Sequence, residues 1–171
     1  MENFSNETID ITALPKYEEV QFLSLHPNYL KVIYINITVF LLLLAGAIGV
    51  LLHFIEELKA FTTYIGIGYL VFAICLYIYG RLSFKLRGYA LREHDILFKS
   101  GVIATKTIIV PFNRIQHVAI HEGLISRMFK LTILEIFTAG GNSSDMHIRG
   151  LEKDKAEPIK QLLMGQIQNQ I

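Results

Sequence analysis

The sequence predicts an α+β fold, in which an N-terminal two-helix transmembrane hairpin is followed by an antiparallel β-sandwich or barrel capped by a C-terminal α-helix. Three observations predict it: two uncharged apolar runs in the first half of the chain, alternation of apolar and polar residues from Phe84 onward, and a helical apolar period near the C-terminus. Hydrophobic residues make up 52% of the chain, which is high for a soluble protein of 171 residues.

The two apolar runs, residues 32–52 and 60–80, contain no Asp, Glu, Lys or Arg. Each is long enough to form a helix of about 30 Å, which matches the hydrocarbon core of a bilayer. Because no charged side chain lies inside either run, a pump or an ion channel is not expected. We expect three parts: an N-terminal tail at 1–28 with a short segment suited to the membrane surface, a two-span hairpin at 29–80, and a soluble domain at 81–171.

The flanks of the two runs predict the orientation of the hairpin. The loop between them carries Glu56, Glu57 and a single Lys59, whereas Lys and Arg are frequent after the second run. Residues 1–80 hold three Lys or Arg against seven Asp or Glu, and residues 81–171 hold thirteen against eight. The positive-inside rule therefore predicts a multi-pass protein with both termini in the cytoplasm. A basic segment next to a membrane anchor is also suited to face anionic lipid.

The alternation and the frequent β-branched residues after the second run predict short strands. Six are expected, at 84–92, 96–101, 102–111, 115–121, 131–139 and 146–151. In the first of them Phe84, Leu86 and Ala90 share one face. Turns are expected at 93–95, at Gly101 and at 140–145, and one helical turn at 124–130.

An amphipathic helix is predicted at the C-terminal end, where apolar residues recur at spacings of three and four. These residues are Ala156, Ile159, Leu163 and Ile167. The helix begins either at a capping box of Asp154 and Glu157 or with Pro158 as its first residue. Its apolar stripe is suited to cover the open end of a curved sheet.

Several segments carry a family resemblance: YALREHDILFKSGVI, then VPFNRIQHVAIHEGLISRMFKL, then LEIFTAGG and IRGL. Together they resemble the bacterial pleckstrin-homology-like (PH-like) domains of YdbS-like membrane proteins, over about residues 20–165. The resemblance implies a PH-like barrel held at the bacterial inner membrane. It also implies a protein partner, a larger membrane protein that carries repeated PH-like domains.

No catalytic, cofactor or metal site is predicted. His117 and His121 are four residues apart, but on a strand this spacing is about 13 Å, too far for one ion. Ser126 lies in no nucleophile elbow, and the Gly-rich turn at 140–145 lacks the lysine of a P-loop. The basic residues form no motif of nucleic-acid binding. We therefore expect a protein that is not an enzyme.

Two groups of residues are candidates for binding. The first is a set of interaction residues in the segment most typical of the resemblance, namely Arg114, Gln116, His117 and Arg127. The two arginines either present guanidinium groups to an acidic partner or a lipid phosphate, or tie loops together by bonding backbone carbonyls or carboxylates such as Glu135. The second is a set of lipid-facing basic residues, namely Arg81, Lys85, Arg87, Lys99 and Lys106.

The sequence thus predicts a membrane-anchored PH-like module for interaction or scaffolding at the cytoplasmic face, with lipid-headgroup binding as the alternative. The acidic turn at 93–95 argues against a direct copy of the phosphoinositide chemistry of eukaryotic PH domains. Small residues in both spans, at 45–49 and 66–68, favour close packing within the hairpin over a homo-oligomer.

Overall fold

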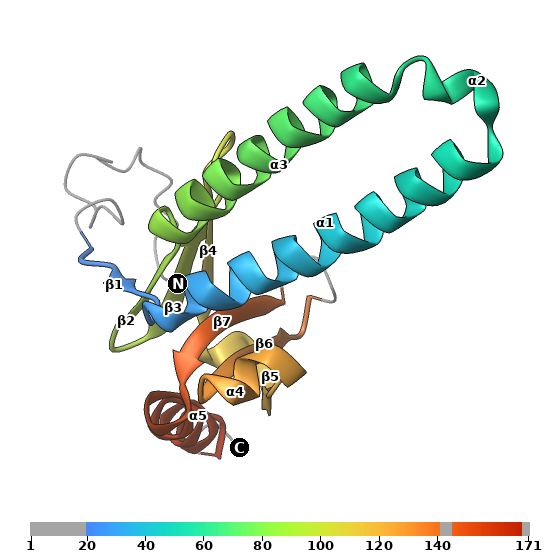
Figure 1. Ribbon diagram of the computed structural model, residues 1–171. Helices are drawn as coiled ribbons and strands as arrows, with labels where there is room; N and C mark the ends of the chain where they lie inside the picture. Colours follow the sequence, from blue (N-terminus) through green and yellow to red (C-terminus); the bar gives the residue numbers. More distant parts are fainter. Residues whose placement is uncertain (1–19, 141–144, 169–171) are drawn as a thin grey trace, which may run out of the picture.

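The computed structural model describes residues 20–140 and 145–168, so the first nineteen residues of the expected tail lie outside it. Its most prominent feature is a pair of antiparallel helices, α1 (Asn28–Phe54) and α3 (Thr62–Lys85), joined through the short helix α2 (Glu56–Lys59). Both long helices are apolar and long enough to cross a membrane. They project together from the β-rich part of the molecule (Figure 1).

The β-rich part consists of two antiparallel sheets, as expected. The first contains β1 (Leu23–Ser24), β2 (Gly88–Leu91), β3 (Asp95–Ser100) and β4 (Lys106–Pro111), in that order. The second contains β5 (Ile115–His121), β6 (Leu131–Thr138) and β7 (Met146–Glu152). The connections are η3 (Phe112–Arg114) between the sheets and α4 (Leu124–Met128) between β5 and β6, and α5 (Lys153–Gln168) follows β7.

The core lies between the sheets and under α5. Residues facing inward alternate along the strands, so that Leu134, Ile136, Met146 and Ile148 are all fully buried. Helix α5 packs against β5, β6 and η3 and closes this core (Figure 1). The fold class predicted from the sequence is therefore confirmed.

The segment before the hairpin differs from the expectation. The segment at 15–27 was expected to lie at the membrane surface, but in its described part Leu23 and Ser24 pair with Tyr89 and Gly88 as an edge strand of the first sheet. Leu25, just beyond this strand, is buried in the core. The hairpin is therefore inserted between two neighbouring strands of one sheet, and the β-rich unit includes residues on both of its sides.

The expectation of a strand at 84–92 is wrong in its first half, because α3 continues to Lys85. The buried positions at the end of this helix are Gly80, Ser83 and, in part, Phe84, which is a helical and not an alternating spacing. Phe84 packs against Tyr29 on α1, with 6.5 Å between the ring centroids. Packing between the two helices therefore extends the second one beyond the expected end at residue 80.

Two more boundaries differ from the expectation. The strand expected at 102–111 begins only at Lys106, because residues 101–105 form the turn of the β3–β4 hairpin. Gly101 in this turn has φ +114°, a conformation that other residues rarely adopt. Helix α5 begins at Lys153, so the start at Pro158 is wrong and the start near Asp154 is closer. Burial of Ala156 against the core holds the first turn in place despite the proline inside the helix.

The expected close packing of the small residues in the spans is also wrong. A Cβ built at Gly46, Gly49, Gly66 or Gly68 has no neighbouring atom within 4 Å. These glycines lie toward the loop end of the hairpin, where the helices leave an apolar hollow of about 220 Å³. The tight approach is at Gly80 instead, where an added Cβ would lie 2.9 Å from Cδ1 of Ile37.

Candidate functional site

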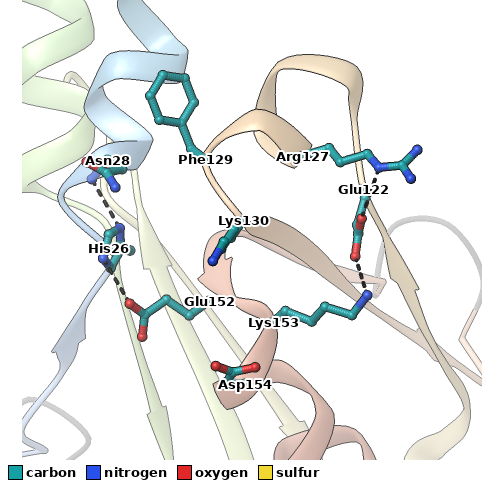
Figure 2. Close-up of a pocket in the computed structure, with 9 residues that line it drawn as sticks. All are labelled: His26, Asn28, Glu122, Arg127, Phe129, Lys130, Glu152, Lys153 and Asp154. Atoms are coloured by element: carbon teal, nitrogen blue, oxygen red, sulfur yellow. Dashed lines mark hydrogen bonds and ion pairs between the residues drawn. The ribbon is translucent and has the colours of Figure 1, made fainter.

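Among the described residues, a first and a second polar cavity have volumes of about 460 Å³ each, and they differ in charge. The first lies where the segment leading into α1 meets α4 and the start of α5 (Figure 2). Its lining residues are His26, Asn28, Glu122, Arg127, Phe129, Lys130, Glu152, Lys153 and Asp154. Basic and acidic side chains alternate around it, so this cavity has no strong preference for an anion or a cation.

Two of the acidic residues that line the first cavity, Glu122 and Glu152, are already paired. Glu152 accepts from His26 Nε2 at 2.9 Å and from Lys155 Nζ at 3.0 Å. Glu122 accepts from Lys153 Nζ at 3.0 Å. The hydrogen bond from Lys155 lowers the pKa of Glu152, and the Glu122 carboxylate raises the pKa of Lys153. The His26–Glu152 pair fastens the entry to α1 onto the end of β7, and the Glu122–Lys153 pair joins the residue after β5 to the start of α5, so we assign this cavity a structural role.

The second cavity, which we call the basic cavity, is strongly cationic. Its lining residues are Arg87, Phe98, Ser100, Lys106, Ile108, Asp145, His147 and Arg149. Three permanently charged cations thus face one carboxylate, and that carboxylate is engaged because Asp145 Oδ1 accepts the backbone N–H of Thr138 at 3.0 Å. A cavity of this size and charge has room for a phosphate group with its substituents.

The cations of the basic cavity are largely available to a ligand. Across residues 20–140 and 145–168, neither Lys106 nor Arg149 forms an ion pair. Arg87 donates from Nη1 to the hydroxyl of Tyr29 at 3.1 Å, a neutral partner that leaves its charge uncompensated. His147 is held by Glu135, whose Oε1 lies 3.3 Å from Nδ1. The cavity can therefore bind an anion without first breaking an ion pair of Lys106 or Arg149.

The register of the first sheet shows which end of the molecule carries the basic cavity. Strand β2 begins at Gly88, three residues after the last residue of α3, and Gly88 pairs with Lys99. The next pair along β3 is Ser100 with Lys106. Ser100 and Lys106 therefore lie at the end of the sheet where the hairpin attaches, and they share the cavity with Arg87.

The predicted lipid-facing residues all lie toward this same end. Arg81 and Lys85 are exposed on the last turns of α3. Lys99 is exposed on the face of β3 opposite to the basic cavity, with its Nζ 5.8 Å from the ring centroid of Phe22. Arg87 and Lys106 line the cavity itself.

Sequence reasoning missed the contribution of β7 to the cavity, namely Asp145, His147 and Arg149. The alternation in this strand places His147 and Arg149 on one face, with Ile148 buried on the other. That much was readable from the sequence. No pattern in the sequence indicated that this face would lie beside Lys106, because the two strands belong to different sheets.

The predicted interaction residues do not form one site. Arg114 precedes β5 and Arg127 follows it, so the whole seven-residue strand separates them. Arg127 is exposed, with its Nε 4.0 Å from a carboxylate oxygen of Glu122 and not beside Glu135. Gln116 lies at an irregularity in the β5–β6 register, and His117 stacks on Phe137 with 4.2 Å between the ring centroids.

Two histidines on the outer face of the second sheet, His121 and His147, contact the same carboxylate, that of Glu135. His121 Nε2 lies 3.1 Å from Oε2 of Glu135, and His147 approaches the other oxygen. In the described part of the chain, no group of three or more His, Cys, Asp or Glu side chains has the arrangement of a metal site. The arrangement around Glu135 is therefore a pair of hydrogen-bonded histidines.

Two sheets closed by a C-terminal helix, with a basic cavity beside two membrane-spanning helices, define a membrane-associated PH-like module. The chain belongs to the bacterial PH domain family, whose model matches residues 30–167. It is also similar to the UPF0699 transmembrane protein YdbS of Bacillus subtilis strain 168, with 29% identity over 87 residues. That alignment covers 51% of this chain and 53% of YdbS, so the chain spans about half the length of this relative. No solved structure matches.

Proposed function

We propose that this protein is a two-span protein of the bacterial inner membrane whose PH-like domain binds anionic lipid headgroups at the cytoplasmic surface. The observation that carries the proposal is the basic cavity, in which Arg87, Lys106 and Arg149 converge at the end of the domain where the membrane helices attach. A lipid phosphate is the anion that this position supplies at high local concentration. The protein is not proposed to catalyse a reaction.

The cytoplasmic orientation rests on the charges that flank the two spans. Arg81 and Lys85 lie on the last turns of α3 and Arg87 follows it, whereas the loop end carries Glu56 and Glu57. The positive-inside rule places the basic end in the cytoplasm. Labelling of an engineered cysteine at the exposed Asn113 in a Cys75→Ser background tests it. The orientation predicts labelling by an impermeant maleimide only after the inner membrane is opened, and labelling in intact spheroplasts would contradict it.

Headgroup binding is tested by neutralising two cations of the basic cavity with Lys106→Gln and Arg149→Gln together. Native mass spectrometry of the full-length protein in detergent then compares the retention of phosphatidylglycerol with that of phosphatidylcholine. Each basic residue near an anionic surface contributes about 1 kcal/mol, so the double variant is expected to weaken the preference for phosphatidylglycerol by about 30-fold.

A charge-matched control removes two cations elsewhere, with Arg114→Gln and Lys160→Gln. The control is expected to keep the preference for phosphatidylglycerol, since neither residue lines the basic cavity. An equal loss in both variants would show that net charge alone attracts the lipid. An unchanged preference in the Lys106 and Arg149 variant would refute the cavity as the site.

A second function, assembly with another membrane protein, is favoured by helix α4. Leu124 and Met128 lie one helical turn apart on α4, and they are 89% and 80% exposed beside the predicted interaction residue Arg127. An exposed apolar pair next to a cation is suited to a protein partner, such as a larger membrane protein with PH-like domains or a second copy of this chain. Co-purification in detergent that is lost with Leu124→Ser and Met128→Ser, but kept with Lys106→Gln and Arg149→Gln, would separate assembly from lipid binding.

A further inference from the structure

The tip of the β3–β4 hairpin carries an unusual set of side chains. Turns are normally rich in polar residues, but here three consecutive positions are apolar: Val102, Ile103 and Ala104. Ile103 is 96% exposed, the highest value among the large hydrophobic side chains of the described residues. The turn is nonetheless well defined, because Gly101 adopts its positive φ and Ser100 still pairs with Lys106. An apolar side chain is therefore held outward on a hydrogen-bonded hairpin.

The strand register places this tip at the membrane end of the domain. Gly88, just after α3, pairs with Lys99, and β3 then continues past the start of β2 toward the tip. Arg87 lines the same cavity as Ser100 and Lys106, the residues on either side of the turn. The β3–β4 hairpin accordingly extends toward the side of the domain from which the two long helices project (Figure 1).

The reach of the hairpin can be compared with the rise of α3. Ile103 is four residues beyond Lys99, and after allowing for the turn it extends about 10 Å past the Gly88–Lys99 pair at about 3.3 Å per residue. Helix α3 ends at Lys85, three residues before Gly88, and Arg81, which directly follows the uncharged span, lies about 6 Å before that end at 1.5 Å per residue. The reach of the hairpin is therefore comparable to the distance between the sheet and the end of the uncharged span.

We propose that the apolar tip of the β3–β4 hairpin inserts Ile103 into the interface of the lipid bilayer, as a third membrane contact beside the two helices. The charges around the tip fit this occupant. Lys99 and Lys106 flank it at headgroup level, where anionic lipid attracts them, and no acidic residue lies between them. The inference rests on the two spans crossing a bilayer and is independent of whether the basic cavity binds a headgroup.

The absence of tryptophan from the chain makes the tip directly testable. In Ile103→Trp, the sole tryptophan reports its surroundings in the full-length protein reconstituted into phosphatidylcholine vesicles. Blue-shifted emission and quenching by lipids brominated along the acyl chains are expected. The matched control is Asn113→Trp, an exposed position beyond the opposite end of β4, for which water-like emission and no quenching are expected. Water-like, unquenched emission from Trp at position 103 would overturn the proposal.

A second measurement avoids the affinity of tryptophan itself for interfaces. With Cys75 replaced by Ser and Ile103 kept in place, Ala104→Cys is labelled by an impermeant maleimide in the reconstituted vesicles. Because burial of the Ile103 side chain favours the inserted tip by about tenfold in equilibrium, labelling at position 104 is expected to be about tenfold slower than for Asn113→Cys after normalisation to denatured protein. Equal rates at the two positions would refute insertion.

These readouts separate the two proposals. Insertion of the tip is measured in vesicles of phosphatidylcholine alone, where headgroup selectivity plays no part. Headgroup binding is measured by the Lys106→Gln and Arg149→Gln variant in detergent, where no bilayer is present. An inserted tip without headgroup preference would support this inference and contradict the proposed function. Headgroup preference without insertion of the tip would support the proposed function and contradict this inference.

Discussion

Gly150 is the position where one added methyl group should disturb the packing of the first helix of the hairpin against the domain. It is the extra residue of a bulge in β7, since Thr132 pairs with Leu151 and Ile133 pairs with Arg149. Its φ is +82°, and a Cβ built there would lie 2.7 Å from Cβ of Tyr29 and overlap its ring. Its carbonyl also accepts the backbone N–H of His26 at 3.1 Å. The first turn of α1 therefore packs directly against the backbone of Gly150.

Two costs add in Gly150→Ala. The left-handed conformation costs an alanine about 1–2 kcal/mol. Displacement of the Tyr29 ring in a packed core costs about 1–3 kcal/mol more. The variant should therefore lower the free energy of unfolding of the domain by about 2–5 kcal/mol.

Pulse proteolysis of the full-length protein across a urea series in detergent measures this difference. The matched control is Gly165→Ala in α5, where an added Cβ meets no atom within 4 Å. This control should stabilise the protein by about 0.5–1 kcal/mol, because alanine favours a helix interior over glycine. A Gly150→Ala midpoint equal to or above that of Gly165→Ala would refute the reasoning.

The Tyr29→Ala background separates the two costs. Without the ring there is no overlap, so the additional effect of Gly150→Ala should fall to the conformational cost of about 1–2 kcal/mol. An undiminished effect would show that the contact with Tyr29 contributes nothing.

Three further predictions concern the strand before the hairpin, an ion pair and the helix contact. Leu25→Ala should destabilise the domain by about 2–4 kcal/mol in the same assay, because Leu25 is 3% exposed and its loss leaves a cavity. The lowered pKa of Glu152, caused first by the hydrogen bond from Lys155, means that this pair stabilises the fold above the ordinary glutamate pKa. That stability is lost as the pH falls through the lowered pKa, and Glu152→Gln should remove this part of the acid sensitivity in pH-dependent unfolding. Gly80→Leu should separate the helices and increase proteolysis near the hairpin, whereas Gly66→Leu, with open space around it, should not.

The sequence predicted the parts of the fold that local patterns determine. The segment IQHVAIH was expected as a strand and is β5 with the same bounds, because it is rich in β-branched residues, of which Ile115 and Val118 are buried in the core. The two spans were recognised because an uncharged run of this length has few other stable environments. The C-terminal helix was recognised from its apolar period, although Pro158 lies inside it and not at its start.

The parts that were missed depend on distant contacts. Strand β1 has two residues and pairs with a strand more than sixty residues later, so no local alternation could indicate it. Phe84 was wrongly assigned to a strand because the local sequence does not show its contact with Tyr29 on the other helix. That contact continues α3. The sequence indicated Arg87 and Lys106 as candidate lipid-facing residues but predicted no cavity, and Arg149, which lines the same cavity, comes from the other sheet.

The insertion of the hairpin between β1 and β2 determines how the domain meets the membrane. A domain that merely followed a span could rotate about its linker, and a basic surface would face the bilayer only part of the time. Here the chain enters α1 directly from the core at Leu25 and Tyr29, and it leaves α3 into β2 within three residues. Tyr29 and Val32 of α1 are themselves buried in the core of the domain. Two connections fix an orientation that one cannot, so the basic cavity and the β3–β4 tip stay on the side of the domain from which the helices project, and the proposed lipid contacts would require no further ordering of the domain.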